Sequence, residues 1–277
     1  MVTRNIFKYL ALTTLALIST TASASAIYLG QEGKMMSCDD RWYDGRGSTH
    51  CEIREQSISA PGGTLIVNGG KNGGISIKGW DQEHVLIRTK IQTHGKSLAE
   101  AREVAGQIQV IATGGNIRAE GPKDRDSYSW SSSYEIFVPR QADLSLETFN
   151  GGISLTDVRG RIEFKALNGG ISIKRVGGSV RGHTTNGGLS VMLDGTTWEG
   201  EGLDVSTTNG GVNIVVPENY SARLESGTVH GGMTLGFPVM VQGRINKEIS
   251  VDLGGGGPTV RAVTTNGGVT IRRQGQN

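Results

Sequence analysis

A six-residue phrase recurs along this sequence: Asn-Gly-Gly, followed by an apolar, a small polar and an apolar residue. Complete copies start at Asn72, Asn150, Asn168, Asn186, Asn209 and Asn266, a variant copy starts at His230, and a degraded copy runs from Asn246 to Val251. From Asn150 onward the starts are 18, 18, 23, 21, 16 and 20 residues apart. This period is too short for a repeat of two helices and suits a coil of a β-solenoid, which contains two strands and two turns.

The Asn-Gly-Gly part of the phrase predicts a sharp corner, because Asn tolerates the left-handed conformation and Gly adopts positive φ without steric cost. Adjacent coils lie about 4.8 Å apart, so stacked corners have room only for small residues or for amides that bond to one another. We therefore expect an Asn ladder beside columns of glycine, and we expect Val at Gly170 to be destabilising. The predicted corner residues are Asn72, Gly73, Gly74, Asn150, Gly151, Gly152, Asn168, Gly169, Gly170, Asn186, Gly187, Gly188, Asn209, Gly210, Gly211, Asn266, Gly267 and Gly268.

The residues on both sides of each corner alternate in polarity with a period of two, which is typical of strands with one buried face. In the strands before the corners the outward positions are charged, and stacking in register would make Glu163, Arg181 and Asp204 neighbours. A helix is expected near 97–106, where Ser97 is suited to cap a run of helix formers. The predicted fold is all-β, a β-solenoid of two-strand coils of about 16–23 residues with one inserted helix.

The first 26 residues have the order of a secretory signal peptide: Arg4 and Lys8, then an apolar stretch, then Ala24-Ser25-Ala26. Removing them takes 2 of the 28 Lys and Arg and none of the 26 Asp and Glu, so the mature charge is near zero. With no cluster of cations, nucleic-acid binding is excluded, and no transmembrane segment is expected after cleavage. We expect an exported protein, periplasmic or extracellular.

The two cysteines, Cys38 and Cys51, lie in the exported part, where a pair usually forms one disulfide. A zinc site would need more ligands than two thiols and the nearby His50. The chain is therefore divided into a signal peptide at 1–26, a disulfide-stapled N-terminal extension at 27–60 and a β-solenoid domain at 61–277.

The phrase Asn-Gly-Gly-Ile-Ser-Ile, the opening at Pro61–Val67, the Lys78–Asp81 turn and the inserted helix together resemble a bacterial family over about residues 52–273. It is the putative-adhesin family of β-strand-repeat proteins, a domain of unknown function related to the auto-transporter adhesin head domain. The resemblance implies a β-solenoid in an envelope-associated protein without established enzymatic activity or catalytic residues. His230 in place of Asn, and Lys247-Glu248 in place of the glycine pair, depart from the pattern.

The sequence contains no arrangement that predicts catalysis or a cofactor. The five His residues are scattered, no triad motif is present, and the corners lack the Asp that calcium-binding solenoids need. We expect no enzyme activity, metal or cofactor, and favour an exported cell-envelope scaffold or adhesion module whose partner is an unknown envelope protein or glycan. Coil lengths that vary from 16 to 23 residues disfavour an ice-binding lattice.

The alternative is a polysaccharide-binding or polysaccharide-active protein. It would use four loop aromatics that could stack on sugar rings, Trp42, Tyr43, Tyr128 and Trp130. Its carboxylates would come from Asp39, Asp40, Asp124 or Asp126, although none of these has a diagnostic spacing.

Overall fold

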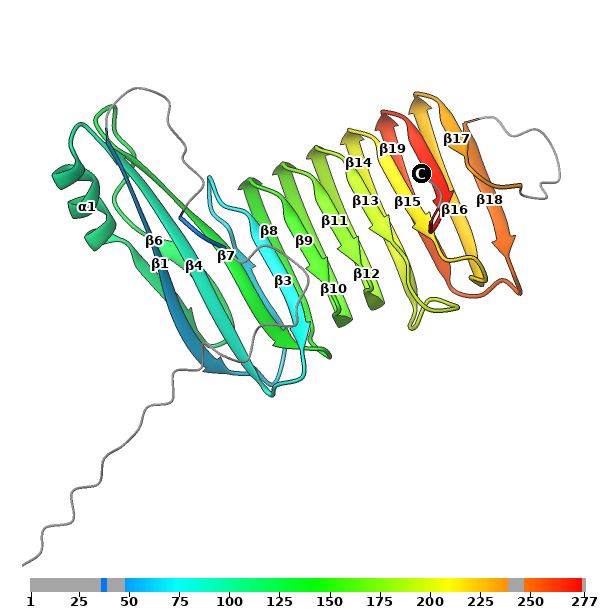
Figure 1. Cartoon of the computed structure of the whole chain (residues 1–277), viewed down its shortest axis with the longest axis horizontal. Helices are drawn as coiled ribbons and strands as arrows, with labels where there is room; N and C mark the ends of the chain where they lie inside the picture. Colours follow the sequence, from blue (N-terminus) through cyan, green and yellow to red (C-terminus); the bar gives the residue numbers. More distant parts are fainter. Residues whose placement is uncertain (1–35, 39–47, 239–246, 276–277) are drawn as a thin grey trace, which may run out of the picture. The chain divides into compact units, whose positions relative to one another are not determined.

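The computed structural model describes residues 36–38, 48–238 and 247–275, which belong to one compact unit. This part of the chain folds into two ten-stranded sheets, called sheet A and sheet B below, and one helix (Figure 1). The all-β class with a single helix is confirmed for the described residues. Among them, no helix is both long and apolar enough to cross a membrane.

Sheet A contains, in spatial order, β1 (Ser48–Ser59), β4 (His84–Gly95), β7 (Ser129–Pro139), β3 (Ile75–Trp80), β9 (Ile153–Thr156), β11 (Ile171–Lys174), β13 (Leu189–Met192), β15 (Val212–Val216), β20 (Val269–Arg273) and β17 (Met233–Leu235). Sheet B contains β18 (Glu248–Leu253), β16 (Ala222–His230), β19 (Thr259–Asn266), β14 (Gly202–Asn209), β12 (Gly177–Asn186), β10 (Arg159–Asn168), β8 (Leu144–Asn150), β2 (Leu65–Asn68), β6 (Asn116–Glu120) and β5 (Gln109–Thr113).

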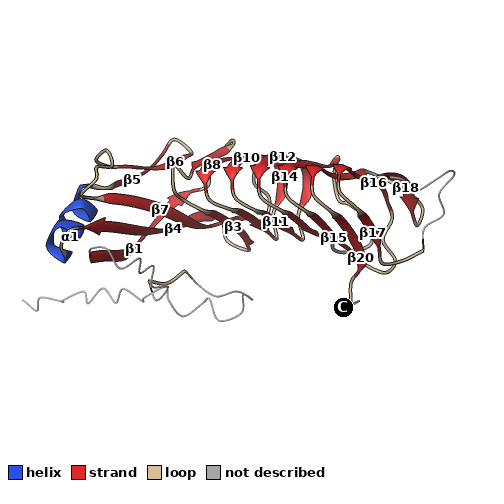
Figure 2. Ribbon diagram, turned by 90° about the horizontal axis from the view of Figure 1, so that it is seen from above, coloured by secondary structure: helices blue, strands red, loops and turns tan. Residues whose placement is uncertain are grey.

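Except in the degraded copy, the repeated phrase places its apolar pair on a strand of sheet A in parallel register with a neighbouring copy. Ile171 pairs with Ile153 on one side and with Leu189 on the other, while Ser172, the next residue along β11, faces outward. The strands of sheet B form a second layer facing sheet A (Figure 2). Their buried residues, such as Ile162, belong to the same core. The hydrophobic core therefore fills the space between the two layers, and its burial is the main stabilising contribution.

The Asn-Gly-Gly segments lie where the chain passes from sheet B to sheet A. Their Asn side chains form a ladder in which each Nδ2 donates to the Oδ1 of the next: Asn150 to Asn72 (2.9 Å), Asn168 to Asn150 (2.8 Å), Asn186 to Asn168 (2.7 Å), Asn209 to Asn186 (2.8 Å) and Asn266 to Asn209 (2.8 Å). In most copies a Thr two residues before the Asn adds a bond, as when Thr184 Oγ1 donates to Gly169 O at 2.8 Å. Amide and hydroxyl groups thus link successive corners.

The expected left-handed backbone at these corners is wrong, since none of the glycines in the Asn-Gly-Gly segments has a φ in that region. The constraint is instead the approach of one backbone to the next. A Cβ on Gly169 would lie 2.0 Å from Gly151 O, whereas a Cβ on Gly170 would lie 3.4 Å from Gly188 O. At this corner only the first glycine of the pair is sterically required, and the left-handed conformation on which the Gly170 prediction rested is wrong.

Charged side chains on the outer face of sheet B alternate in sign across the strands. Glu163 on β10 lies opposite Arg181 on β12, and Arg181 lies opposite Asp204 on β14. This neighbour relation confirms the register predicted from the sequence. On the next strand Arg261 lies opposite Asp204, and its Nη1 donates to Asp204 Oδ1 at 2.6 Å.

The structure departs from coils stacked in chain order near the C-terminal end. Strands β19 and β20 lie between β14 and β15 on one side and β16 and β17 on the other. A strand of sheet B together with the strand of sheet A that follows it is called a coil, so β19 and β20 form the last coil of the described residues. The degraded copy is placed differently from the others: Asn246 is outside the described residues, and Ile249 and Val251 lie on β18, antiparallel to β16 at the edge of sheet B. Lys247 and Glu248 stand where the other copies have the glycine pair, and side chains at the first of these two positions would overlap the neighbouring backbone of a stacked corner.

The N-terminal end is also mixed rather than parallel. Strand β1 pairs antiparallel with β4, which pairs antiparallel with β7. The helix α1 (Leu98–Gln107) contacts both β1 and β4, and Ser97 caps it by accepting a bond from Glu100 N, as the sequence predicts. The predicted disulfide joins Cys38 to Cys51 on β1. The helix and long strands cover the end of the stack, as capping units do in repeat proteins.

Candidate functional site

The loop aromatics and carboxylates singled out in the sequence divide into two groups. Trp42, Tyr43, Asp39 and Asp40 lie outside the described residues, whereas Asp124, Asp126, Tyr128 and Trp130 lie in or beside the segment between β6 and β7.

Within that segment the side chains contact the chain itself. The indole N–H of Trp130 donates to Pro122 O at 2.7 Å, and its ring lies beside Gly121. The Arg125 guanidinium lies 5.8 Å from the ring centroid of Tyr128. These contacts hold the aromatic side chains, and sugar stacking on them stays a prediction.

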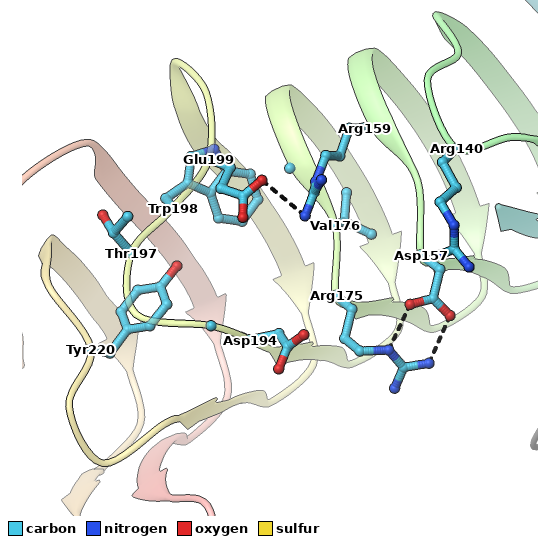
Figure 3. A pocket seen from close by; sticks show the side chains of 12 residues that line it. Arg140, Asp157, Arg159, Arg175, Val176, Asp194, Thr197, Trp198, Glu199 and Tyr220 are labelled. Carbon is cyan, nitrogen blue, oxygen red and sulfur yellow. Dashed lines mark hydrogen bonds and ion pairs between the residues drawn. The ribbon is translucent and has the colours of Figure 1, made fainter. Parts of the chain in front are cut away.

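A cleft of about 210 Å³ lies along the turns that lead from sheet A back to sheet B (Figure 3). Its walls come from successive turns of the stack, so residues far apart in sequence meet there. The side chains that line the cleft include Arg140, Asp157, Arg159, Arg175, Asp194, Thr197, Trp198, Glu199 and Tyr220.

Two of these turns contain the only non-glycine residues with positive φ in the described part of the chain, Asp157 (57°) and Arg175 (50°). They are equivalent residues 18 positions apart. The Arg175 guanidinium donates to both carboxylate oxygens of Asp157, at 2.6 and 2.8 Å (Figure 3). A two-bond arginine–carboxylate contact is directional, and here it supports two turns that each hold an L-residue in the left-handed region.

Further arginine–carboxylate pairs lie on both sides of the Asp157–Arg175 pair. Arg140 donates to Asp81 at 2.6 Å, and this bond holds the pKa of the Asp81 carboxyl below its ordinary value. Arg159 lies 2.8 Å from Glu199 across the cleft (Figure 3). Guanidinium and carboxylate groups therefore alternate along the turns, which fixes the direction of each hydrogen-bonding group.

Two aromatic residues complete the wall of the cleft. Trp198 is buried and donates its indole N–H to Gly178 O at 2.9 Å. Tyr220 is 2 % exposed, and in Figure 3 its hydroxyl is directed into the space enclosed by the other side chains. Burial raises the pKa of Tyr220, and the carboxylates of Asp194 and Glu199 raise it further. The hydroxyl therefore stays protonated and can act as a hydrogen-bond donor.

The cleft thus presents paired guanidinium and carboxylate groups together with the Asp194 carboxylate and the Tyr220 hydroxyl. In the described residues, no group of three or more His, Cys, Asp or Glu side chains is placed to hold a metal ion. The arrangement suits recognition of a polar molecule by several hydrogen bonds at once.

A wider groove of about 580 Å³ crosses the outer face of sheet B over β12, β14, β19, β16 and β18. His183 and Ser206 are hydrogen-bonded in it, with 3.0 Å between Nδ1 and Oγ, and Val229, 53 % exposed, adds an apolar side chain. This groove is a second polar surface on the outward face of the stack.

The cleft was not predicted from the sequence, because the turns that form it differ from copy to copy, whereas the Asn-Gly-Gly corners are nearly identical. The available signal was the 18-residue spacing of Asp157 and Arg175, equal to the local period of the repeat. Residues separated by one period stack in a coiled repeat, so opposite charges at that spacing predict an ion pair.

No protein-family model matches this sequence, and no curated protein matches it. The solved structures that resemble the fold include a protein from Clostridium sporogenes named a "putative cell adhesion protein", at 10% identity over 82% of this chain and 100% of that one, with a TM-score of 0.44. A "putative adhesin" from Bacteroides fragilis has 12% identity over 80% and 97% of the two chains and a TM-score of 0.38. A "putative lipid binding protein" from Parabacteroides distasonis has 8% identity over 82% and 97%, with a TM-score of 0.30.

Proposed function

We propose that this protein is a non-catalytic interaction module exported to the cell envelope. The observation that carries the proposal is the state of the charged groups in the cleft. Asp157 is bonded to Arg175, Glu199 is paired with Arg159, and the buried Tyr220 contributes a neutral hydroxyl. Acid–base catalysis needs a group that exchanges a proton near neutral pH, whereas recognition needs fixed donors and acceptors.

Export is supported by the signal-peptide pattern of residues 1–26 and by the Cys38–Cys51 disulfide, a bond typical of oxidising compartments. We place the mature protein in the periplasm or outside the cell. We further propose that the parallel part of the fold, from β8 and β9 to β19 and β20, is a β-solenoid. The parallel register and the Asn ladder support this.

The partner we propose is an envelope protein or glycan that binds in the cleft between Asp194 and Tyr220. The Tyr220 hydroxyl supplies a donor, the Asp194 carboxylate an acceptor, and Thr197 either role. Hydroxyl and amide groups, which both classes of partner contain, match this set.

The test compares binding of the wild-type protein and the Tyr220→Phe variant to isolated peptidoglycan sacculi and membrane vesicles of the producing cell. Losing one buried hydrogen bond to the partner costs about 1.4 kcal/mol, which is about a tenfold loss of affinity. Tyr134→Phe is the matched control, because Tyr134 is equally buried but its hydroxyl lies 3.3 Å from Ser132 Oγ. Binding to neither fraction, or equal binding by the wild type and Tyr220→Phe, contradicts the proposal.

A further inference from the structure

The last coil of the chain occupies a slot between two coils that precede it in sequence. Strand β19 pairs with β14 and β16, and β20 pairs with β15 and β17. The coil is thus bordered on both sides by earlier strands of the same chain. A stack wound in chain order would have placed β16 directly on β14.

The charges on these strands show why the slot stays open for this coil. Arg261 of β19 lies opposite Asp204 of β14 and also opposite Glu225 of β16. If β16 paired with β14 in the same register, Asp204 and Glu225 would lie opposite each other. Like charges at directly opposed positions of a sheet are destabilising, so Arg261 between Asp204 and Glu225 favours the observed strand order.

The connection to the last coil is a short, glycine-rich crossing. Strand β18 pairs with one edge of β16. The run Gly254–Gly257 then leads to β19, which pairs with the opposite edge of β16. Three of these glycines have positive φ: Gly254 (54°), Gly256 (73°) and Gly257 (137°). A Cβ on Gly254 would lie 2.4 Å from Ser221 Oγ, so the crossing passes close to the start of β16. A short, glycine-rich crossing of this kind can serve as a hinge for domain swapping.

The order of synthesis leaves the slot empty for a time. Residues 222–235, which form β16 and β17, emerge before residues 259–273, which form β19 and β20. During that interval the acceptor edges of β14 and β16 are unpaired, and they match the final coil of any copy of this chain equally well. Capture from another molecule then competes with insertion of the chain's own coil.

We propose that the slot between β14–β15 and β16–β17 is an acceptor site for residues 259–273 of a second copy of this chain, so that two copies exchange their last coils. The hinge at Gly254–Gly257 opens, while each slot keeps the same β pairs and the same Asp204–Arg261 contact as in the monomer. The exchange is independent of the partner that binds in the cleft.

The experiment mixes two single-cysteine variants, Asn213→Cys and Thr270→Cys. Asn213 on β15 lies opposite Thr270 on β20, and both lie on the outer face of sheet A. The two variants are unfolded together in urea at mildly acidic pH, which protects the native disulfide from exchange, refolded at a series of concentrations and then oxidised. Only in exchanged dimers does the introduced thiol of one variant lie beside the introduced thiol of the other. The bond between them is identified by mass spectrometry, and the product is called the cross-linked dimer below.

We expect the fraction of chains in the cross-linked dimer to rise with the chain concentration during refolding. We expect no cross-linked dimer when each variant is refolded alone before mixing. A mixture of Ser190→Cys and Asn213→Cys is the matched control. These positions face each other on β13 and β15, neither of which exchanges, and the mixture should give no specific dimer. Absence of the cross-linked dimer at every concentration, or equal dimer in the control mixture, overturns the proposal. Far-ultraviolet circular dichroism verifies that each variant refolds.

Discussion

The sharpest test of the corner geometry compares two single variants, in which one or the other of two adjacent glycines of a corner is replaced by alanine. A Cβ on Gly169 would lie 2.0 Å from Gly151 O and 2.4 Å from Gly151 C, both backbone atoms. A Cβ on Gly170 would meet Gly188 O at 3.4 Å, which is ordinary contact, and its φ lies outside the left-handed region. The two substitutions therefore add the same methyl group in very different environments.

For Gly169→Ala, the two coils must separate by about 1 Å to restore normal contact. That movement stretches the bond from Gly151 N to Asn168 O, now 3.0 Å, and the Asn168–Asn150 side-chain bond, now 2.8 Å. Overpacking costs about 1 to 3 kcal/mol, and two weakened hydrogen bonds add about 1 kcal/mol. A loss of about 3 kcal/mol lowers the melting temperature of a domain of this size by about 6 to 12 °C.

For Gly170→Ala we expect a change within about 0.5 kcal/mol, or a small gain, because alanine reduces the entropy of the unfolded chain. Urea and thermal unfolding, followed by circular dichroism, measure both variants against the wild type. Equal losses for the two variants, or a larger loss for Gly170→Ala, would refute the assignment of close backbone approach to the first glycine.

Three further predictions concern the ladders and the cleft. Thr184→Val removes the donor to Gly169 O and should lower the free energy of unfolding by about 1 kcal/mol in urea titrations; no loss would mean that this bond does not stabilise the corner. Arg261→Glu places a carboxylate opposite Asp204 and should lower the free energy of unfolding most at low salt and least at high salt. A loss that does not depend on salt would contradict a stabilising role for the alternating charges. Burial, with Asp194 and Glu199, raises the pKa of Tyr220, so the unfolded chain loses this proton first as pH rises. Stability should therefore be full below about pH 10 and fall above it, with a smaller fall in Tyr220→Phe, and an identical fall in that variant would exclude Tyr220 as its source.

The parts of the fold that the sequence predicts are those in which neighbouring copies are alike. The Asn ladder and the facing of Glu163 by Arg181 follow from one period of 18 residues. The helix follows from local signals at Ser97. The role of the glycines could not be read from one copy, because the constraint lies between two copies rather than within the turn.

The order of the coils was not predictable from the repeated phrase, since Asn209 could face either the copy at His230 or the copy at Asn266. The charge sequence did contain the answer. Asp204 and Glu225 need a basic residue between them, and Arg261 supplies it on the last coil. The cleft was harder, because it depends on turns of unequal length and on Tyr220, a residue without a counterpart in other copies.

The last coil of the described fold lies between two coils that precede it in sequence. Disulfide trapping within one chain at high dilution tests this arrangement most directly. Asn213→Cys with Thr270→Cys joins neighbouring strands, whereas Asn213→Cys with Thr234→Cys joins strands that are separated by β20. A disulfide needs Cβ atoms about 4 Å apart, and strands two positions apart are separated by about 10 Å. We expect rapid oxidation of the first pair and none of the second; rapid oxidation of the second pair in place of the first would show that the coils stack in chain order.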